Sequence, residues 1–281
     1  MKKETKTLIF DEDLKIEAYR FEGIMQPFPN HFHDYYVIGL IESGKRHLSC
    51  KNEEYMIGQD AMLLFNPGDN HACAPYDNET LDYRALNISQ NSMLDLVEEV
   101  TGRREFIGFC ENVVADEEAT CYFRTLHRMI MEESNEFEKE ENLLLLISAL
   151  VQKYGQPFEM CIPECQKEIE EVCCFMEQNY EKHISLDEIC RKAGLSKSTL
   201  LRAFTKTKGI TPYRYLETIR INEAKKLLEK GVMPLEAALK TGFSDQSHFT
   251  RYFNQFIGLA PGVYRDIFKK ERKARKMEDE E

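Results

Sequence analysis

The sequence predicts a multidomain protein of α and β structure. An N-terminal β-barrel with flanking helices is expected over residues 1–155, and an all-helical domain with two helix-turn-helix units over residues 164–270. Segments rich in β-branched and aromatic residues fill residues 8–90, separated by Gly, Pro and Asn, which is typical of antiparallel barrels and sandwiches. Helical periodicity begins after residue 90. Near the C-terminus one pattern occurs twice, which implies one structural unit used twice.

Composition is that of a globular protein and excludes several classes. Of the 281 residues, 42% are hydrophobic and 31% are charged. No apolar run approaches the roughly 20 residues of a membrane helix, and we expect no export signal because no apolar core follows the first residues. The nine cysteines are odd in number and include no C-x-x-C pair. They indicate free thiols in a reducing cytoplasm.

Charge is divided unevenly along the chain. The formal net charge is −12. Residues 1–163 hold 15 Lys and Arg against 30 Asp and Glu, whereas residues 164–281 hold 22 against 19. A basic segment on an acidic chain is typical of nucleic-acid binding. The charge pattern therefore assigns nucleic-acid binding to the C-terminal half.

The N-terminal half is expected to form short strands and then helices. The second expected helix carries Phe123, Leu126, Met129 and Ile130 on one side, an amphipathic stripe that suits packing on the barrel or on a second subunit. A linker is expected over residues 156–163, followed by helices only and by a frayed charged tail. The clearest strands are residues 35–41, 46–50 and 61–65, and the helices are residues 92–101, 116–134 and 138–154.

The repeated pattern reads GLSKSTLLRAFTKTKGITPYRY from Gly194 and GFSDQSHFTRYFNQFIGLAPGVYR from Gly242. The two glycines are 48 residues apart, but from Ser198 and Ser247 onward the offset is 49. The second turn is therefore one residue longer than the first. The aligned pairs are Leu200/Phe249, Arg202/Arg251, Phe204/Phe253, Gly209/Gly258, Pro212/Pro261 and Tyr215/Tyr264.

Capping signals give each copy the form helix, short turn, helix. In the first unit, residues 185–206, Ser185 begins a capping box, Gly194 ends the first helix and Ser196 caps the second. In the second unit, residues 234–257, a proline starts the first helix and a glycine again makes the turn. This is the helix-turn-helix arrangement.

A longer helix from Pro212 to about residue 230 is expected to hold the two units at a fixed separation. The second helices of the two units would then enter successive major grooves about 34 Å apart. Arg bonds guanine bidentately, and Gln, Ser and His suit base edges or phosphates. The predicted DNA-binding residues are Lys197, Ser198, Thr199 and Arg202 in the first unit, and Gln246, Ser247, His248, Thr250 and Arg251 in the second.

The second copy, from Ala238 through Gly242-Phe243-x-Asp245-x-Ser247-x-Phe249-x-Arg251-x-Phe253 to Arg265, resembles the signature of AraC/XylS-type transcription regulators. The helix from Leu216 through Leu228 resembles that family's connecting helix. The resemblance covers residues 165–268. It departs at Asn254, where the family usually has Lys, and Leu201 leaves fewer polar side chains on the first recognition helix.

The N-terminal half resembles the cupin barrel that senses ligands in such regulators, through His31-Phe32-His33, Gly44, Gly58 and Pro67-Gly68-x2-His71. Enzymatic cupins bind metal with a similar H-x-H, a nearby Glu and a later His. Here the Glu is absent, so no metal is expected. If a metal is bound, His31, His33 and His71 are its ligands. Otherwise these histidines bind an organic effector together with Tyr36 and Tyr83, or pack at the barrel mouth.

These observations favour a transcription regulator, and the resemblance favours an activator over a repressor. The expected partners are double-stranded DNA, a small-molecule effector, RNA polymerase if the protein activates, and a second copy of the chain through helices near residues 116–153. No enzyme activity, cofactor or membrane contact is expected. The alternative is a cupin metalloenzyme or metal sensor fused to a DNA-binding module.

Overall fold

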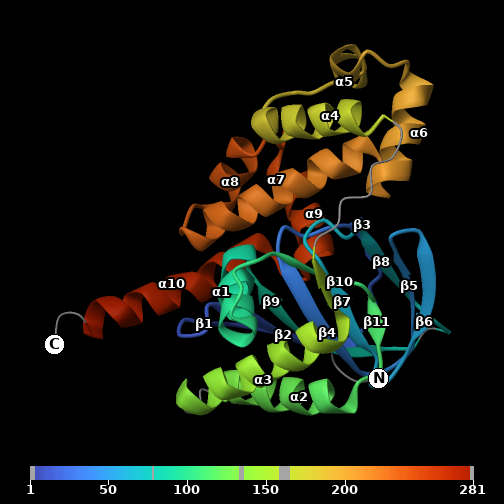
Figure 1. The fold of residues 1–281 in the computed structure, drawn as a ribbon. Helices are drawn as coiled ribbons and strands as arrows, with labels where there is room; N and C mark the ends of the chain where they lie inside the picture. Colours follow the sequence, from blue (N-terminus) through green and yellow to red (C-terminus); the bar gives the residue numbers. More distant parts are fainter. Residues whose placement is uncertain (1–3, 78, 133–135, 158–164, 279–281) are drawn as a thin grey trace. The chain divides into compact units, whose positions relative to one another are not determined.

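Contacts divide the chain into two compact units, of which residues 1–27 and 32–160 form the first and residues 28–31 and 161–281 the second. The first unit is rich in strands and the second is helical (Figure 1), which confirms the predicted fold class. No helix of the described part is long and apolar enough to cross a membrane. The structure, a computed structural model, describes residues 4–77, 79–132, 136–157 and 165–278.

The larger sheet has six strands in the order β1-β2-β9-β4-β7-β11, and every neighbouring pair is antiparallel. Strand β5 (Arg46–Cys50), which belongs to the smaller sheet, has the bounds that the sequence predicts. The strands of the larger sheet are β1 (Thr5–Asp11), β2 (Ile16–Ile24), β9 (Leu81–Ile88), β4 (Tyr36–Ser43), β7 (Met62–Phe65) and β11 (Val113–Val114).

A four-stranded sheet has the order β3-β8-β5-β6, and a separate pair joins β10 to β12. Among the described strands no ring of hydrogen bonds joins the two larger sheets. The predicted barrel-like β domain therefore has the form of a two-sheet, jelly-roll-like domain. Its remaining strands are β3 (Phe28–His31), β8 (His71–Pro75), β6 (Glu53–Ile57), β10 (Ile107–Phe109) and β12 (Gly155–Pro157).

Helices α1 (Gln90–Thr101), α2 (Glu117–Met131) and α3 (Glu136–Tyr154) come after β9, as predicted, but β10 and β11 lie between α1 and α2, and β12 follows α3. These helices cover one face of the six-stranded sheet (Figure 1), and apolar side chains from both layers form one continuous core. Burying each such side chain stabilises the fold by about 1.5–3 kcal/mol. The sheet contributes Ile16, Ala18, Tyr36, Ile38, Leu40, Leu86 and Ile88, and the helices contribute Val97, Phe123, Leu126, Leu146 and Leu150.

The first two residues of the expected linker lie in a strand. Residues 156 and 157 belong to β12, where they pair with β10, and residues 158–163 lie outside the described part of the chain. The expected tail also differs, because the backbone of α10 (Pro261–Glu278) stays helical to residue 278. Its last three residues are not described.

The second unit consists of helices alone among its residues from 165 to 278, as predicted. Helices α5 and α6 form the first predicted pair and α8 and α9 the second, with α7 between them. The bounds are α4 (Gln166–Asn179), α5 (Leu186–Ala193), α6 (Lys197–Lys208), α7 (Pro212–Glu229), α8 (Pro234–Lys240) and α9 (Gln246–Ile257).

Candidate functional site

The first helix-turn-helix is built by the caps that the sequence predicts. Ser185 Oγ accepts a hydrogen bond from Glu188 N at 3.2 Å and starts α5. Gly194 ends that helix with a φ of +65°, a conformation that favours glycine. Ser196 Oγ then accepts from Thr199 N at 3.3 Å and starts α6. The turn between α5 and α6 therefore spans residues 194–196.

The second unit uses the same arrangement with a longer turn. Pro234 occupies the first turn of α8, where its missing N–H costs nothing. Gly242 has a φ of +83°. Asp245 accepts a hydrogen bond from His248 N at 2.7 Å and caps α9, and this bond lowers the pKa of the Asp245 carboxyl. Residues 241–245 form the turn, so the caps Ser196 and Asp245 keep the 49-residue offset while the turns differ.

Each unit has the same aromatic core. Phe204 and Phe253 are fully buried, as are the aligned Leu200 and Phe249. The ring of Phe204 meets Tyr215 edge-on at 5.4 Å between centroids, and Phe253 meets Tyr264 edge-on at 5.6 Å. The tyrosine hydroxyls donate to carboxylates on neighbouring helices, at 2.6 Å to Glu177 and 2.8 Å to Glu229.

Helix α7 lies between the two helix-turn-helix units and contacts α4, α6, α8, α9 and α10. Its Arg220 donates from Nε to Tyr180 O and from a terminal nitrogen to Lys182 O, both at 2.8 Å. A Cβ on Gly242 would stand 2.6 Å from Tyr180 O and 3.0 Å from Arg220 Nε. Glycine at the second turn therefore allows α7, the end of α4 and the second unit to meet closely.

On α6 the predicted DNA-binding residues occupy the first two turns. Lys197 is exposed and its Nζ lies 2.5 Å from Asp187 Oδ1, whereas Thr199 is half-buried. Ser198 and Arg202 lie on the α6 backbone, but their side chains are outside the described part of the structure. The structure thus places the backbone of α6, and the DNA-binding role of all four residues remains a prediction.

On α9, Gln246, Ser247 and Arg251 are exposed, as predicted. Thr250 is half-buried. His248 differs from the expectation of an outward side chain, because its ring packs against Tyr252 at 4.5 Å and Phe243 at 5.8 Å between centroids.

Sequence analysis did not predict a cluster of charged and aromatic side chains that joins α9 to α7. The guanidinium groups of Arg214 and Arg251 lie 5.3 and 5.5 Å from the centroid of the Tyr252 ring. Arg214 also pairs at 3.0 Å with Glu217, which is 1% exposed on α7. Burial raises the pKa of Glu217, and the charge of Arg214 opposes this. Spacing on α7 alone could have suggested the Arg214–Glu217 pair, which is an i, i+3 contact.

The five predicted effector residues do not share one pocket. Tyr36 belongs to the core under the helices and donates its hydroxyl to Ile107 O at 2.7 Å. Tyr83 lies on the opposite face of the same sheet, where its ring covers Gly39 and leaves no room for a Cβ there. Side chains alternate between the two faces of a sheet, so the two tyrosines point apart. Burial raises the pKa of both hydroxyls.

The three predicted histidines do come together. One ligand nitrogen from each of His31, His33 and His71 lies within 4.8 Å of the others. His31 Nδ1 lies 2.6 Å from Pro29 O and His71 Nδ1 lies 3.0 Å from Asp69 O. Donation from Nδ1 to a carbonyl leaves Nε2 as the ligand atom, and burial lowers the pKa of His71 to about 4, so it is neutral at pH 7. The donor set fits a three-histidine metal site.

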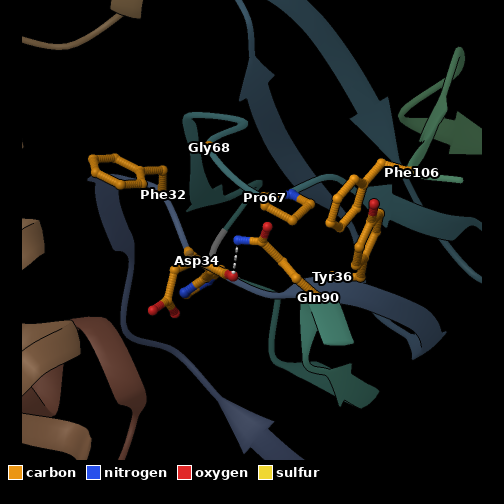
Figure 2. A pocket seen from close by; sticks show the side chains of 8 residues that line it. Phe32, Asp34, Tyr36, Pro67, Gly68, Gln90 and Phe106 are labelled. Atoms are coloured by element: carbon orange, nitrogen blue, oxygen red, sulfur yellow. Dashed lines mark hydrogen bonds between the residues drawn. The ribbon is translucent and has the colours of Figure 1, made fainter. Parts of the chain in front are cut away.

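A pocket of about 510 Å³ opens where the loops after β3 and β7 meet the start of α1. Figure 2 shows its side chains and the hydrogen bond that Gln90 Nε2 donates to Asp34 O at 2.8 Å. Its walls are mainly aromatic and apolar, which suits a small organic molecule. Two predicted effector residues, His33 and Tyr36, line it together with Phe32, Asp34, Pro67, Gly68, Gln90 and Phe106.

Comparison with known proteins assigns both units. Residues 13–147 match the model of the AraC-like ligand binding domain, and residues 189–267 match that of the helix-turn-helix domain. The chain is 49% identical to the uncharacterized HTH-type transcriptional regulator YbfI of Bacillus subtilis, over 96% of this chain and 99% of that protein. The chain belongs to the AraC family. It is a transcription regulator with an N-terminal ligand-binding domain and a C-terminal DNA-binding domain.

Two further matches are more distant. The transcriptional activator RhaS of Klebsiella pneumoniae is 25% identical, over 85% of this chain and 87% of that protein. The crystal structure of ToxT from Vibrio cholerae O395 has the same fold, with a TM-score of 0.55 and 17% identity over 90% of this chain and 97% of that one. YbfI is named as a transcriptional regulator and RhaS as a transcriptional activator, which agrees with the regulator that the sequence predicts.

Proposed function

We propose that this AraC-family regulator binds an asymmetric DNA half-site, with α6 and α9 in successive major grooves. The observation that carries the proposal is the pair of matched units on one shared helix, α7. Their contacts to DNA come from Lys197, Ser198, Thr199, Arg202, Gln246, Ser247, His248, Thr250 and Arg251. These sets differ between the units, so each reads different bases.

Regulation comes from a small molecule bound in the N-terminal domain, and its binding favours one arrangement of the protein on DNA. The match to a ligand-binding domain and the pocket of Figure 2 support this. ToxT, which shares the fold, has been crystallised with an unsaturated fatty acid. The RhaS relative is an activator, and on that basis we assign activation through RNA polymerase, by a homodimer formed through α2 and α3.

Footprinting of the full chain on a library of random DNA tests the DNA-binding part. We expect one bipartite site whose affinity falls steeply with salt, because each neutralised phosphate releases counterions. A folded protein that protects no site in any effector condition contradicts the proposal.

A second candidate is a metal sensor, and the clustering of His31, His33 and His71 favours it. A bound divalent metal would supply a link between these three side chains. Elemental analysis of the purified protein tests it. The expected result is about one metal ion per chain, lost in His33→Ala; a metal-free protein with unchanged DNA binding removes this candidate.

A further inference from the structure

Arg46 is a fully buried cation that the function described above does not use. It lies on β5, where the buried residues Arg46, Leu48 and Cys50 alternate with the more exposed His47 and Ser49. Its side chain is 0% exposed. Charged side chains are almost never fully buried unless they are paired.

The guanidinium reaches from the smaller sheet to the end of β2 in the larger one. One terminal nitrogen donates to Ile24 O, and the other donates to Gln26 O over 3.5 Å. Nε is buried and has no hydrogen-bond partner. Main-chain carbonyls are neutral, so these bonds hold the group in place without compensating its charge.

No acidic side chain in the described part of the chain pairs with Arg46. The buried acid of β2, Glu17, lies at the other end of that strand, where its Oε2 accepts from Asn87 at 3.1 Å. The neighbour that influences the charge of Arg46 is the thiol of Cys73, whose own pKa burial raises to about 11. At neutral pH that thiol is protonated, so it brings no negative charge.

A guanidinium carries five N–H donors, and Nε with one terminal nitrogen forms the fork that fits a carboxylate. A single cation balances one negative charge, which matches a carboxylate better than a doubly charged phosphate. On the face of the larger sheet opposite the helix-covered core, Phe21 and Tyr83 are cross-strand partners, so that face carries aromatic side chains.

We infer that Arg46 anchors the carboxylate of a small, mainly apolar effector held between the two sheets. This inference rests on the proposed effector function and deepens it by naming the ligand class and the binding face. It separates the site from the pocket of Figure 2, whose lining does not include Arg46.

The test begins with stability in the absence of ligand. Arg46→Met removes the uncompensated charge at nearly constant volume, so we expect its thermal midpoint to equal or exceed that of the wild type. An arginine that serves only to tie the ends of the strands would give a lower midpoint on substitution. Lys45→Met, at the exposed neighbouring position, is the matched control.

The same full-length proteins are then titrated with benzoate, phenylacetate and octanoate, each beside its uncharged amide. We expect at least one carboxylate to stabilise the wild type and Lys45→Met, its amide to have no effect, and the affinity to fall at least ~10-fold in Arg46→Met and in Arg46→Lys, which lacks the fork. Equal binding by Arg46→Met, equal binding of the amide, or no carboxylate response in the wild type overturns the inference.

Two further measurements separate this inference from the proposed function. If Phe106→Ala abolishes binding while Arg46→Met does not, the ligand lies in the pocket of Figure 2, and the proposed function stands without the inference. Gel shifts on the same proteins report DNA binding independently. Their failure would remove the proposed function while leaving the carboxylate response of Arg46 intact.

Discussion

The two helix-turn-helix units share their apolar core but differ in what supports the recognition helix. At the 49-residue offset, Ala203 of α6 corresponds to Tyr252 of α9. The tyrosine lies under Arg251 and Arg214, and buried Glu217 on α7 pairs with Arg214. Alanine at position 203 offers no ring there, and the cation–π contact of α6 lies at its last residue, where Lys208 Nζ is 6.0 Å from the centroid of the Tyr215 ring. The apolar positions repeat because both units need the same packing, whereas the polar positions diverge, as the proposed asymmetric half-site requires.

The largest expected effect tests whether the cores are equivalent. Phe204→Ala and Phe253→Ala each remove a fully buried ring, so each should lower the free energy of unfolding by about 3–5 kcal/mol. Urea denaturation of the full chain measures both. Leu201→Ala, at a position 37% exposed, is the control and should change stability by less than about 0.5 kcal/mol. A large cost for only one phenylalanine would show that the cores are not equivalent.

Alanine substitution of the turn glycines, Gly194 and Gly242, should destabilise the two helix-turn-helix units to different extents. Both have positive φ, where an L residue costs about 1–2 kcal/mol. A Cβ at Gly194 meets nothing within 4 Å, but at Gly242 it stands 2.6 Å from a backbone oxygen. We therefore expect Gly194→Ala to cost about 1 kcal/mol and Gly242→Ala about 3 kcal/mol, because strain and a clash combine. Thermal or urea unfolding of both variants measures the two losses of stability. Equal losses would mean that the second turn relaxes away from Tyr180.

The contrast between these turns also shows what sequence could and could not predict. The caps at Ser185 and Ser196 and the glycine at position 194 are local signals, and the structure confirms all three. The clash behind Gly242 depends on Tyr180, far away in the chain, so no local pattern reveals it.

In the N-terminal domain, too, local features could be predicted from the sequence and long-range features could not. Strand β5 was predicted with its exact bounds because propensity and turn residues are local. The arrangement of the strands in two separate sheets was not predicted, since pairing between strands far apart in the sequence is a long-range property. Tyr36 and Tyr83 were grouped as one site, but the register of β4 against β9 places them on opposite faces of the sheet, and that register is known only from the structure. Alternation along β5, by contrast, could have identified Arg46 as buried.

The base-pair preferences of arginine variants should also distinguish α6 from α9. Arg202→Ala and Arg251→Ala should each weaken specific binding by about 1–3 kcal/mol and relax preference at different base pairs. Selection from a randomised library, followed by sequencing of the bound DNA, measures this. Lys206→Ala, at an exposed position late in α6, should weaken binding uniformly across sequences. Loss of preference at the same base pair in both arginine variants would contradict independent reading.

The smallest expected effect concerns the buried carboxyl behind α9. Burial raises the pKa of Glu217 in the folded protein, so the folded state binds the proton more tightly than the unfolded chain, in which a glutamate titrates near ~4.3. The free energy of unfolding therefore falls as the pH rises from that value through the raised pKa. Glu217→Gln removes this loss, and we expect it to stabilise the protein by about 1 kcal/mol at pH 7.

The stabilisation by Glu217→Gln should vanish below about pH 4, where the wild-type carboxyl is protonated in both states. Glu177→Gln is the matched control, because Glu177 accepts from Tyr215 in the first unit but is exposed. Urea unfolding at a series of pH values gives both differences. A pH-dependent gain in the free energy of unfolding for Glu217→Gln alone would establish that the buried Glu217 carboxylate beside α9 lowers stability. An equal gain in both variants would remove this distinction between the two helix-turn-helix units.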